Sequence, residues 1–345
     1  MRTIEWLSES NTVRLIDQRQ LPARLDYIIC SSASEMAEAI RTMAIRGAPA
    51  LGVAGAFGVA LDAMNGDFST IREMKTRLQE SANLLEQSRP TAINLAWGVS
   101  RIMSVLECQT SISEAQQRIL SEALAIAEED VQTNFLLAKN GASLIDDGDT
   151  IIHHCNTGSL AVVDWGTALG AIRFAHEQGK KVHVLVDETR PRLQGSRLTA
   201  WELDQYHIPY EIITDNAAGY FLQSGRVQKV FFGADRVAAN GDVVNKIGTY
   251  MLSLAAHANR VPVICVFPIS TLDLNINSGF QVNIEHRDPQ EVLGLRYQGE
   301  VIAPENASAL NPAFDVTPNE LISAWVTEHG VIRPPFAQNL TSLRL

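Results

Sequence analysis

The second half of the chain contains five short runs that are apolar at nearly every position, and these constrain the fold more than any other feature. The runs are Ile151–Cys155, Lys181–Asp187, Pro209–Thr214, Gln228–Gly233 and Val261–Phe267. Helical patterns separate most of them, for example the one that starts at Thr167 and closes at Gly179. Strands that are apolar on both faces, with helices between them, are typical of a parallel sheet covered on both sides. The sequence therefore predicts an α/β fold built on an open parallel sheet.

The first part of the chain predicts mainly helices, preceded by short strands at Ile4–Leu7 and Thr12–Ile16. Three helix starts are indicated by a Ser or Thr followed three residues later by Glu, the capping-box pattern. These boxes are Ser32–Glu35, Thr70–Glu73 and Ser111–Glu114. The last box opens one long helix, or two abutting helices, that end near Gly141. Because 345 residues exceed what one hydrophobic core usually organises, we expect a mainly helical domain over 1–130 and the sheet domain over 131–345.

Two further helices are expected in the sheet domain. One follows the turn at Asn240–Asp242 and runs over Asn245–His257. The other begins at Thr317, has Pro318 at its first position, and stops near Gly330.

Charge and cysteine usage exclude several classes of function. A formal net charge of −11 disfavours nucleic acid or an anionic membrane as a partner, although one phosphate needs only a helix N-terminus and a few basic side chains. The four cysteines form no CxxC pair, so neither a structural zinc site nor a disulfide framework is expected. No signal-peptide layout and no apolar run of about 18–20 residues are visible. We expect a soluble, cytoplasmic protein.

Polar residues directly follow four of the apolar runs. They are Cys155–Ser159, Asp187–Arg190, Thr214–Asn216 and Ala234–Arg236. In open parallel sheets, ligands bind beyond the carboxyl ends of the strands. The sequence therefore predicts a site at this edge of the sheet.

Two residues of this edge have the chemistry of a catalytic pair, and each has a plainer interpretation. Backbone N–H groups at a strand–helix connection would lower the pKa of the Cys155 thiol, but most free cysteines are small buried hydrophobes. Apolar walls would keep Asp235 protonated as a general acid, but it could equally pair with Arg236 or cap a turn. His153 and His154 point to opposite faces of a strand, so at most one faces the site.

Several basic residues could bind an anion. Arg46 and Gly47 precede Pro49, which suits the first position of a helix whose free N–H groups can hold a phosphate. The alternative is a tight helix–helix turn in which Gly52, Gly55 and Gly58 allow close packing. Arg89 stands at another helix entry, and Lys246 stands near the Asp235 rim. On spacing alone both also fit solvated surface residues. The polar connection Glu188–Ser196 can be interpreted as a loop of defined shape or as an ordinary αβ crossover connection.

Six blocks of sequence together resemble the methylthioribose-1-phosphate isomerase family. The blocks are RGAPALG (46–52), RPTAINL (89–95), HCNTG (154–158), DETRPRLQGSRLTAWEL (187–203), ITDNAAG (213–219) and GADRVAANGDVVNKIGTY (233–250). Their order and spacing match over nearly the whole chain. This family shares a superfamily with regulatory subunits of the eukaryotic initiation-factor-2 guanine-nucleotide exchange factor.

The resemblance implies a function and a set of site residues. It implies that 5-methylthioribose 1-phosphate is isomerised to the ribulose 1-phosphate in methionine salvage, by a homodimer with a C-terminal Rossmann-like domain and no metal or organic cofactor. It assigns Cys155 and Asp235 to catalysis. It assigns the following residues to substrate binding: Arg46, Gly47, Ala48, Arg89, Gln194, Asn245 and Lys246. Two positions depart from the family pattern, Arg192 where an apolar residue is expected and His286 where an acid is more usual.

Three other functions are compatible with an α/β chain of this kind. An isomerase of 5-deoxyribose 1-phosphate or ribose 1,5-bisphosphate would keep Cys155 and Asp235 and differ around C5 of the sugar. A non-catalytic exchange-factor subunit would need neither residue. An NAD-dependent dehydrogenase is set aside, because the turn Asn156–Ser159 lacks the GxGxxG pattern that dinucleotide binding requires.

Overall fold

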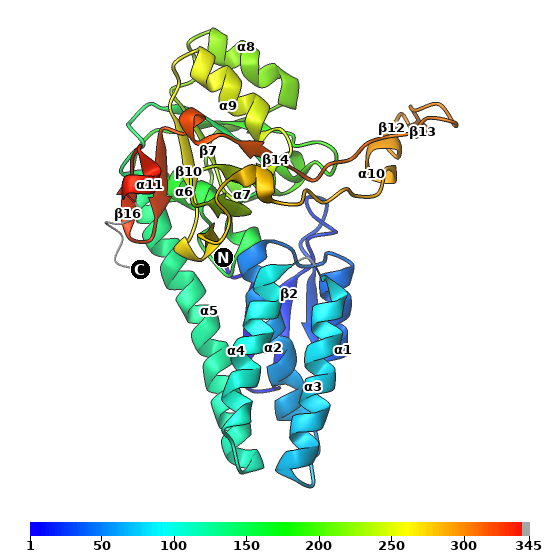
Figure 1. The fold of residues 1–345 in the computed structure, drawn as a ribbon. Coiled ribbons are helices and arrows are strands. Elements are labelled where there is room, and N and C mark those ends of the chain that lie inside the picture. The colour runs from blue at the N-terminus through cyan, green and yellow to red at the C-terminus, as the bar shows by residue number, and fades with distance from the viewer. Residues whose placement is uncertain (91, 340–345) are drawn as a thin grey trace. The chain divides into compact units, whose positions relative to one another are not determined.

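The chain forms two compact units, seen in the ribbon of Figure 1. The computed structural model describes residues 1–90 and 92–339. The first unit comprises Met1–Phe135 and Thr157–Gly166, and the second comprises Leu136–Asn156 and Thr167–Leu345. The sequence-based division into 1–130 and 131–345 does not include this return of residues 157–166 to the first unit.

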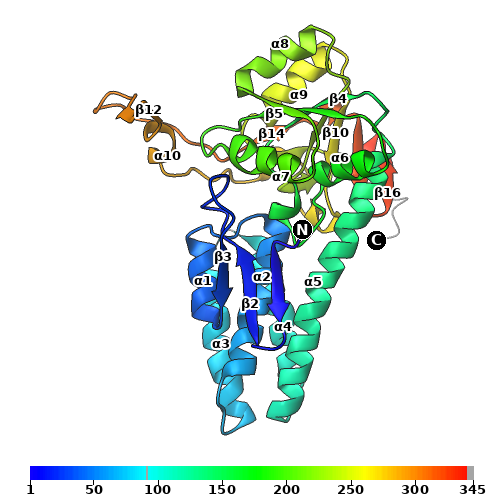
Figure 2. The same cartoon turned by 180° about the vertical axis from the view of Figure 1, so that it is seen from behind.

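The first unit combines a small antiparallel sheet with five helices, and Figure 2 shows the three strands on one side of the helices. The strands are β1 (Ile4–Leu7), β2 (Thr12–Ile16) and β3 (Tyr27–Cys30), and the helices are α1 (Ala33–Arg41), α2 (Ala48–Asn65), α3 (Ile71–Ser88), α4 (Ile93–Glu107) and α5 (Ile112–Ala142). The unit boundary at Phe135 falls within α5.

The three helix starts predicted from capping boxes are confirmed. The side chain of Ser32 accepts a hydrogen bond from the Glu35 N–H at 3.3 Å, and that of Thr70 accepts from the Glu73 N–H at 3.1 Å. Ser111 does the same for Glu114 at 3.3 Å. Each cap satisfies a donor that the first turn of a helix leaves unpaired. The third cap opens α5, which is one continuous helix.

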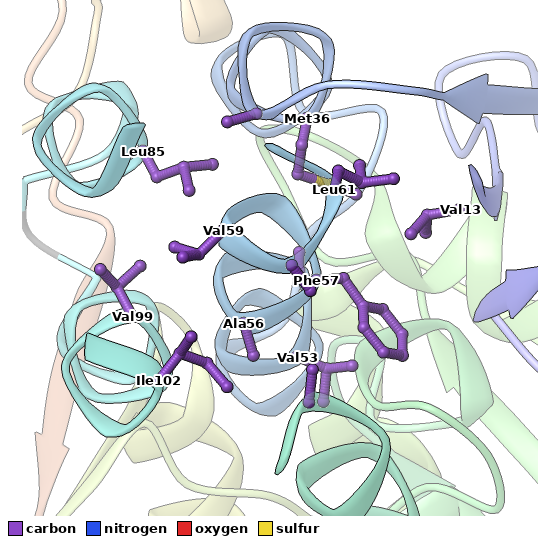
Figure 3. Packing of buried hydrophobic residues seen from close by; sticks show 14 of the residues in the cluster. Val13, Met36, Val53, Ala56, Phe57, Val59, Leu61, Leu85, Val99 and Ile102 are labelled. Carbon is purple, nitrogen blue, oxygen red and sulfur yellow. The ribbon is translucent and has the colours of Figure 1, made fainter. Parts of the chain in front are cut away.

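Helix α2 forms the centre of the first unit's core. Figure 3 shows Val53, Phe57 and Leu61 of α2 among side chains of the surrounding elements. Glycines let α4 come close to it, because a Cβ at Gly98 would lie 2.0 Å from the Gly52 carbonyl oxygen. Helix α2 is long and apolar enough to cross a membrane, but 72% of its residues are buried within the protein. It is therefore a core helix.

A seven-stranded sheet organises the second unit, with strand order β16-β15-β10-β7-β4-β5-β6. All neighbours are parallel except β15 and β16. The strands are β4 (Thr150–His153), β5 (His183–Asp187), β6 (Tyr210–Ile213), β7 (Lys229–Phe232), β10 (Val263–Val266), β15 (Ala324–Thr327) and β16 (Gly330–Ile332). The five predicted apolar runs are β4, β5, β6, β7 and β10, so the predicted open parallel sheet is confirmed.

Alternate residues of these strands belong to two hydrophobic clusters on opposite faces. Ile152 and Phe232 pack with α8 (Ala218–Gln223) and α9 (Thr249–Ala258). Ile151 and Phe231 pack with α6 (Ala168–Glu177), α7 (Ala200–Gln205) and the end of α5. Because successive side chains of a strand point to opposite faces, continuous apolar runs are what a sheet covered on both sides requires.

The predicted helix from Thr317 to Gly330 is wrong. Strand β14 (Phe314–Thr317) ends at Thr317, and after Pro318 the chain makes only a short 3-10 turn, Asn319–Leu321. The residues that follow, Ala-Trp-Val-Thr, form β15 beside β10. The aromatic and β-branched residues of this segment favour a strand, and this preference outweighs the helix-start signal of Pro318.

The helix predicted over Asn245–His257 begins later than expected. Asn245 and Lys246 end strand β9 (Val243–Lys246), which lies between β8 (Arg236–Ala238) and β14 in a second sheet that also contains β11 (Leu272–Asp273). Helix α9 starts only after Gly248, which has the left-handed φ of +102°. Cross-strand pairing with Phe314 and Asp315 holds Lys246 and Asn245 in the strand.

The remaining elements are short. A hairpin of β12 (Arg296–Tyr297) and β13 (Glu300–Val301) follows α10 (Gln290–Leu293), and α11 (Phe336–Asn339) closes the described chain. In Figures 1 and 2 the hairpin extends away from the sheet of its own unit. We call residues 287–311 the arm.

Candidate functional site

The residues predicted for the site belong to both units. Cys155, Asp235, Gln194, Asn245 and Lys246 lie in the second unit, and Arg46, Gly47, Ala48 and Arg89 lie in the first. We describe the two groups separately.

Cys155 and Asp235 follow neighbouring strands of the parallel sheet. Strands β4 and β7 pair in parallel, with His153 opposite Phe231. Cys155 comes two residues after the end of β4, and Asp235 comes three residues after the end of β7. Adjacent strands are about 4.8 Å apart, so the two residues leave the same carboxyl edge from adjacent positions. This is the edge at which the sequence predicts a site.

The backbone of Cys155 is held in an unusual conformation. Its φ is +65°, a left-handed value that non-glycine residues rarely adopt. Its N–H donates to Thr189 Oγ1 at 3.0 Å, and its carbonyl accepts from Thr199 Oγ1 at 2.7 Å. The residue is buried. Two hydroxyl groups from another part of the chain therefore hold the peptide units on both sides of Cys155, which compensates for the conformational cost.

These hydroxyl groups are positioned by a close approach of the chain after β5. A Cβ at Gly195 would lie 1.7 Å from the Asp187 carbonyl oxygen, so only glycine fits there. Residues Gly195–Thr199 form a π-helical turn that continues into α7. Thr199 also accepts a hydrogen bond from Asn156 Nδ2 at 3.2 Å, and Asn156 Nδ2 donates to the buried Glu202 Oε1 at 2.8 Å. The turn thus holds both residues 155 and 156.

Asp235 differs from its prediction in one respect. Its side chain is exposed, so the apolar walls expected to keep it protonated do not enclose it. Its backbone N–H donates to the Val244 carbonyl at 3.0 Å, which ties it to β9. The ion pair of Arg236 is made with Asp273 at 3.4 Å.

Asn245 and Lys246 are buried, which rules out the interpretation of Lys246 as a solvated helix residue. Lys246 Nζ donates to the Ala313 carbonyl at 2.7 Å and lies 4.4 Å from the centre of the Phe314 ring. Asn245 Nδ2 donates to Thr249 Oγ1 at 2.9 Å. A buried ammonium group is a strong local source of positive charge for an anionic ligand.

The connection that carries Gln194 is a shaped loop, one of the two predicted alternatives. Both carboxylate oxygens of Asp215 accept from its backbone, from the N–H of Thr189 and of Arg190, each at 2.7 Å. Arg192, one of the two positions that depart from the family pattern, forms an ion pair with Glu291 of the arm at 2.8 Å. Gln194 is buried, and its Oε1 accepts no hydrogen bond from any described residue. A buried acceptor of this kind can take a donor from a ligand or from an ordered water.

In the first unit, Arg46, Gly47 and Ala48 form the turn into α2. Gly47 has a φ of +93°, and a Cβ there would lie 2.2 Å from the Ala161 carbonyl oxygen. Pro49 is the second residue of α2, one position later than predicted, and the first turn has neither a side-chain cap nor an acidic residue. Its N–H groups therefore suit an anion. Close packing by Gly52 and Gly55 against α4, the alternative interpretation, is observed, while anion binding by this turn stays a prediction.

Arg89 is the C-cap of α3 and is half-buried. Helix α4 begins at Ile93, with Ala92 as its N-cap. Thr91, which belongs to the same block of family resemblance, lies outside the described residues.

The sequence interpretation gave no role to the residues that hold the site in place, namely His154, Asp187, Thr189, Thr199 and Asp215. Three of them, His154, Asp187 and Asp215, are the one group in the described chain whose donor atoms all lie within 4.8 Å of one another, as metal ligands do. Hydrogen bonds already occupy both nitrogens of His154 and both oxygens of Asp215. We therefore assign no metal to them. The available signal was that His154, Asp187 and Asp215 lie at the end of β4, β5 and β6 or within two residues of it.

The chain is similar to known proteins over almost its full length. The model of the Initiation factor 2 subunit family matches residues 44–334. The methylthioribose-1-phosphate isomerase of Thermotoga maritima is 46% identical over 342 residues, which cover 99% of this chain and 98% of the relative.

Two solved structures have the same fold and a similar sequence. The crystal structure of 5-methylthioribose 1-phosphate isomerase from Pyrococcus horikoshii has a TM-score of 0.93 and 40% identity, and covers 99% of this chain and 95% of that one. A structure described as the translation initiation factor eIF-2B, subunit delta, from A. fulgidus has a TM-score of 0.92 and 43% identity, and covers 99% and 98%. The chain therefore belongs to the Initiation factor 2 subunit family and, within it, to the methylthioribose-1-phosphate isomerases.

Proposed function

We propose that this protein is an aldose–ketose isomerase that converts 5-methylthioribose 1-phosphate into 5-methylthioribulose 1-phosphate. The observation that carries the proposal is the similarity to the Thermotoga maritima isomerase over almost the whole of both chains. The sheet edge described above supports it, because a thiol and a carboxyl group follow adjacent strands there.

The substrate sets the chemical problem. Its phosphate is attached to the anomeric oxygen, so the free ring–chain equilibrium of ordinary aldoses is blocked, and the enzyme must promote ring opening. We propose that Asp235 donates a proton to the ring oxygen and that Cys155 helps to move hydrogen between C2 and C1. Because Asp235 is exposed in this structure, a bound sugar would have to shield it from water to keep it protonated.

Residues of the second unit are proposed to bind the sugar and its charge. The unmatched Oε1 of Gln194 would accept a hydrogen bond from a sugar hydroxyl. Lys246, buried beside the Ala313 carbonyl, would contribute positive charge, and Asn245 lies next to it on β9.

Residues of the first unit are proposed to hold the phosphate. Arg46 brings a guanidinium group to the turn, and Gly47 and Ala48 start a helix whose first N–H groups lack a side-chain cap. Arg89 would assist. Gly47 packs against Ala161 of the same unit.

A homodimer in the cytoplasm is also proposed. Several exposed apolar side chains on α8 and α9, two helices that contact each other, support self-association, since exposed apolar surface often marks an interface. They are Tyr220, Tyr250, Met251 and Leu254. Sedimentation analysis of the purified protein at micromolar concentration would detect the dimer.

The alternative functions remain distinguishable. An isomerase of 5-deoxyribose 1-phosphate or ribose 1,5-bisphosphate would show a higher kcat/KM for that sugar than for 5-methylthioribose 1-phosphate. A non-catalytic exchange-factor subunit would turn over none of the three. The presence of both Cys155 and Asp235 favours the enzyme.

The roles of the two proposed catalytic residues are tested by Cys155→Ala and Asp235→Asn. We expect each to abolish turnover in a discontinuous assay for the ketose phosphate, while the circular dichroism spectrum stays unchanged. Cys108→Ala and Asp204→Asn, at an exposed cysteine and an exposed aspartate, are the matched controls and should stay active. Appreciable turnover by either catalytic variant would reject the role of that residue.

A further inference from the structure

A buried pair of side chains beside Cys155, His154 and Asp187, has no assigned role in the reaction. Each has a relative exposure of 1%. His154 Nδ1 lies 2.8 Å from Asp187 Oδ2, and His154 Nε2 lies 3.0 Å from the Ile247 carbonyl oxygen. Both ring nitrogens are therefore engaged, by partners from two different segments.

These two partners determine where the protons are. The Ile247 carbonyl can only accept a hydrogen bond, so His154 Nε2 must carry a proton. One further proton must lie between Nδ1 and the Asp187 carboxylate, on either side. The pair is thus an imidazolium with a carboxylate, or an imidazole with a carboxylic acid, and its net charge is zero in both states. A neutral pair costs less to bury than two separate charges, although the second oxygen, Asp187 Oδ1, accepts no hydrogen bond from any described residue.

The electrostatic surroundings agree with a shared proton. Burial lowers the pKa of His154, but the hydrogen bond and charge of Asp187 raise it, and the net direction is upward. Burial raises the pKa of Asp187 to about 6, although the hydrogen bond to His154 opposes this shift. The two pKa values shift as expected for a pair that titrates as one unit.

The other titratable groups around the pair are themselves fixed. Asp215 is held by the Thr189 and Arg190 N–H groups, and Asp315 accepts from the Gly248 N–H at 2.7 Å and from the Tyr250 N–H at 3.2 Å. His153, on the adjacent position of β4, is buried, which lowers its pKa to about 3, and the charge of His154 adds to this effect. Glu188 acts on Asp187 through its charge, and Lys246 acts in the same way on Asp315.

The imidazole ring joins three segments that carry proposed site residues. It precedes Cys155 in the chain. Asp187 ends β5 and accepts at its backbone carbonyl from Thr189 Oγ1, the group that receives the Cys155 N–H. Ile247 directly follows Lys246. The ring also sits against the start of α9, where a Cβ at Gly248 would lie 2.9 Å from His154 Cε1.

We propose that His154 is a positioning residue of the isomerase. With Asp187 and one shared proton, it holds Cys155 in its positive-φ conformation and links it to the end of β9 that carries Lys246. The inference rests on the proposed function, because it gives the pair a purpose in that reaction. Loss of the shared proton at alkaline pH would leave the lone pairs of His154 Nδ1 and Asp187 Oδ2 facing each other, with the two atoms 2.8 Å apart. The arrangement around Cys155 then relaxes, and kcat falls.

The test uses three variants of the full-length protein. His154→Asn keeps a donor toward Asp187, His154→Gln keeps a donor toward Ile247, and each breaks the bridge. We expect each to lower kcat by about 100-fold, as small misplacements of reacting groups do, with KM changed much less. Asp187→Asn retains a hydrogen bond to neutral His154 but removes the shared proton. The Asp187→Asn variant should shift the alkaline limb of the kcat–pH profile to higher pH, by about one pH unit or more.

A second measurement reports on Cys155 without turnover. In a Cys108→Ala background, which removes the exposed thiol, the rate of Cys155 alkylation by iodoacetamide should change in the His154 variants. His183→Gln, at a half-exposed histidine at the start of β5, is the control and should alter neither kcat nor alkylation.

The outcomes separate the inference from the proposed function. If the wild-type protein isomerises none of the three ribose phosphates, the proposed function fails, and the inference fails with it. If the wild type is active and folded His154 variants keep its kcat, the inference alone is overturned. The inference would also be overturned if the kcat–pH profile of Asp187→Asn had the same shape as that of the wild type. A bridge with a purely structural role would not shift the alkaline limb of that profile. This profile decides the matter should the His154 variants not fold.

Discussion

The two units hold their candidate site residues by different physical means. In the first unit, Arg46 and Arg89 stand at helix ends, and the helices are set by close packing of small residues such as Gly52 and Gly98. In the second unit, buried polar side chains hold the site, and Thr199 bonded to the Cys155 carbonyl is an example. Packing is non-directional, whereas hydrogen bonds fix orientation.

This difference separates stability from geometry. Where packing dominates, a substitution changes how close two helices come, and the main effect is on the free energy of unfolding. Where buried hydrogen bonds dominate, removing one partner also leaves a group unsatisfied, at about 1–3 kcal/mol, and lets the site move. Substitutions in the first unit should therefore act mainly on stability, and those in the second unit on the orientation of site residues.

The largest effect is expected for Gly98→Ala in the first unit. The new methyl group would lie 2.0 Å from the Gly52 carbonyl oxygen, so α2 and α4 would have to separate. We expect a loss of about 3 kcal/mol in the free energy of unfolding, at the upper end for overpacking. Urea denaturation measures it.

Gly219→Ala in α8 is the matched control, because no atom lies within 4 Å of the added Cβ. Alanine favours helix over glycine by up to about 1 kcal/mol, so this variant should be slightly stabilised. A Gly98→Ala protein as stable as the wild type would show that α2 and α4 have room to separate, and the contrast between the units would be lost.

An intermediate effect is expected at Asp130, a half-buried aspartate of the first unit. Burial raises its pKa to about 7, against the hydrogen bonds from the Val163 N–H and from Asn134. The folded state therefore favours the protonated acid. The resulting stability is full below the ordinary pKa of 3.8 and is lost as the pH rises through about 7.

Asp130→Asn removes this titration. Between pH 5 and pH 8 we expect the wild type to lose about 2 kcal/mol of unfolding free energy relative to the variant. Urea denaturation at several pH values measures the difference. The control is Glu128→Gln, which changes an exposed carboxyl group on the same helix, α5. A constant difference across this range would contradict the prediction.

The smallest effect is expected where the arm meets the loop of Gln194. The Arg192–Glu291 pair is half-buried, with side-chain exposures of 30% and 19%, and Asn311 also donates to Glu291 at 3.0 Å. A double-mutant cycle with Arg192→Met and Glu291→Gln should give a coupling of about 0.5–1 kcal/mol. The same cycle on the exposed Arg41–Glu38 pair of α1 should give less. Equal couplings would mean that partial burial does not strengthen the Arg192–Glu291 pair.

The sheet was predictable because its signal is local. Each central strand is apolar on both faces, and the helix starts of the first unit are marked by capping boxes. The segment after Pro318 was misassigned because the helix-start signal is also local, while the strand Ala324–Thr327 depends on pairing with β10, nearly sixty residues earlier.

The site was predictable only in part. The position of Cys155 and Asp235 at the ends of adjacent strands follows from the sheet topology, although their catalytic roles stay predictions. The hydroxyl of Thr199 reaches Cys155 across 44 positions of sequence, and no spacing rule reveals such a contact. The exposure of Asp235 was equally hidden, because enclosure depends on which side chains surround a residue in space.

The return of residues 157–166 to the first unit has a consequence for how the protein is made. This segment supplies the carbonyl groups of Val163 and Leu160, which accept from the Thr3 N–H at 2.9 Å and from Gln18 Nε2 at 2.7 Å. On the ribosome, the N-terminal unit therefore cannot be completed until its neighbour's first strand, β4, has been synthesised. A gene cut at residue 135 would encode a fragment that lacks part of its own interior.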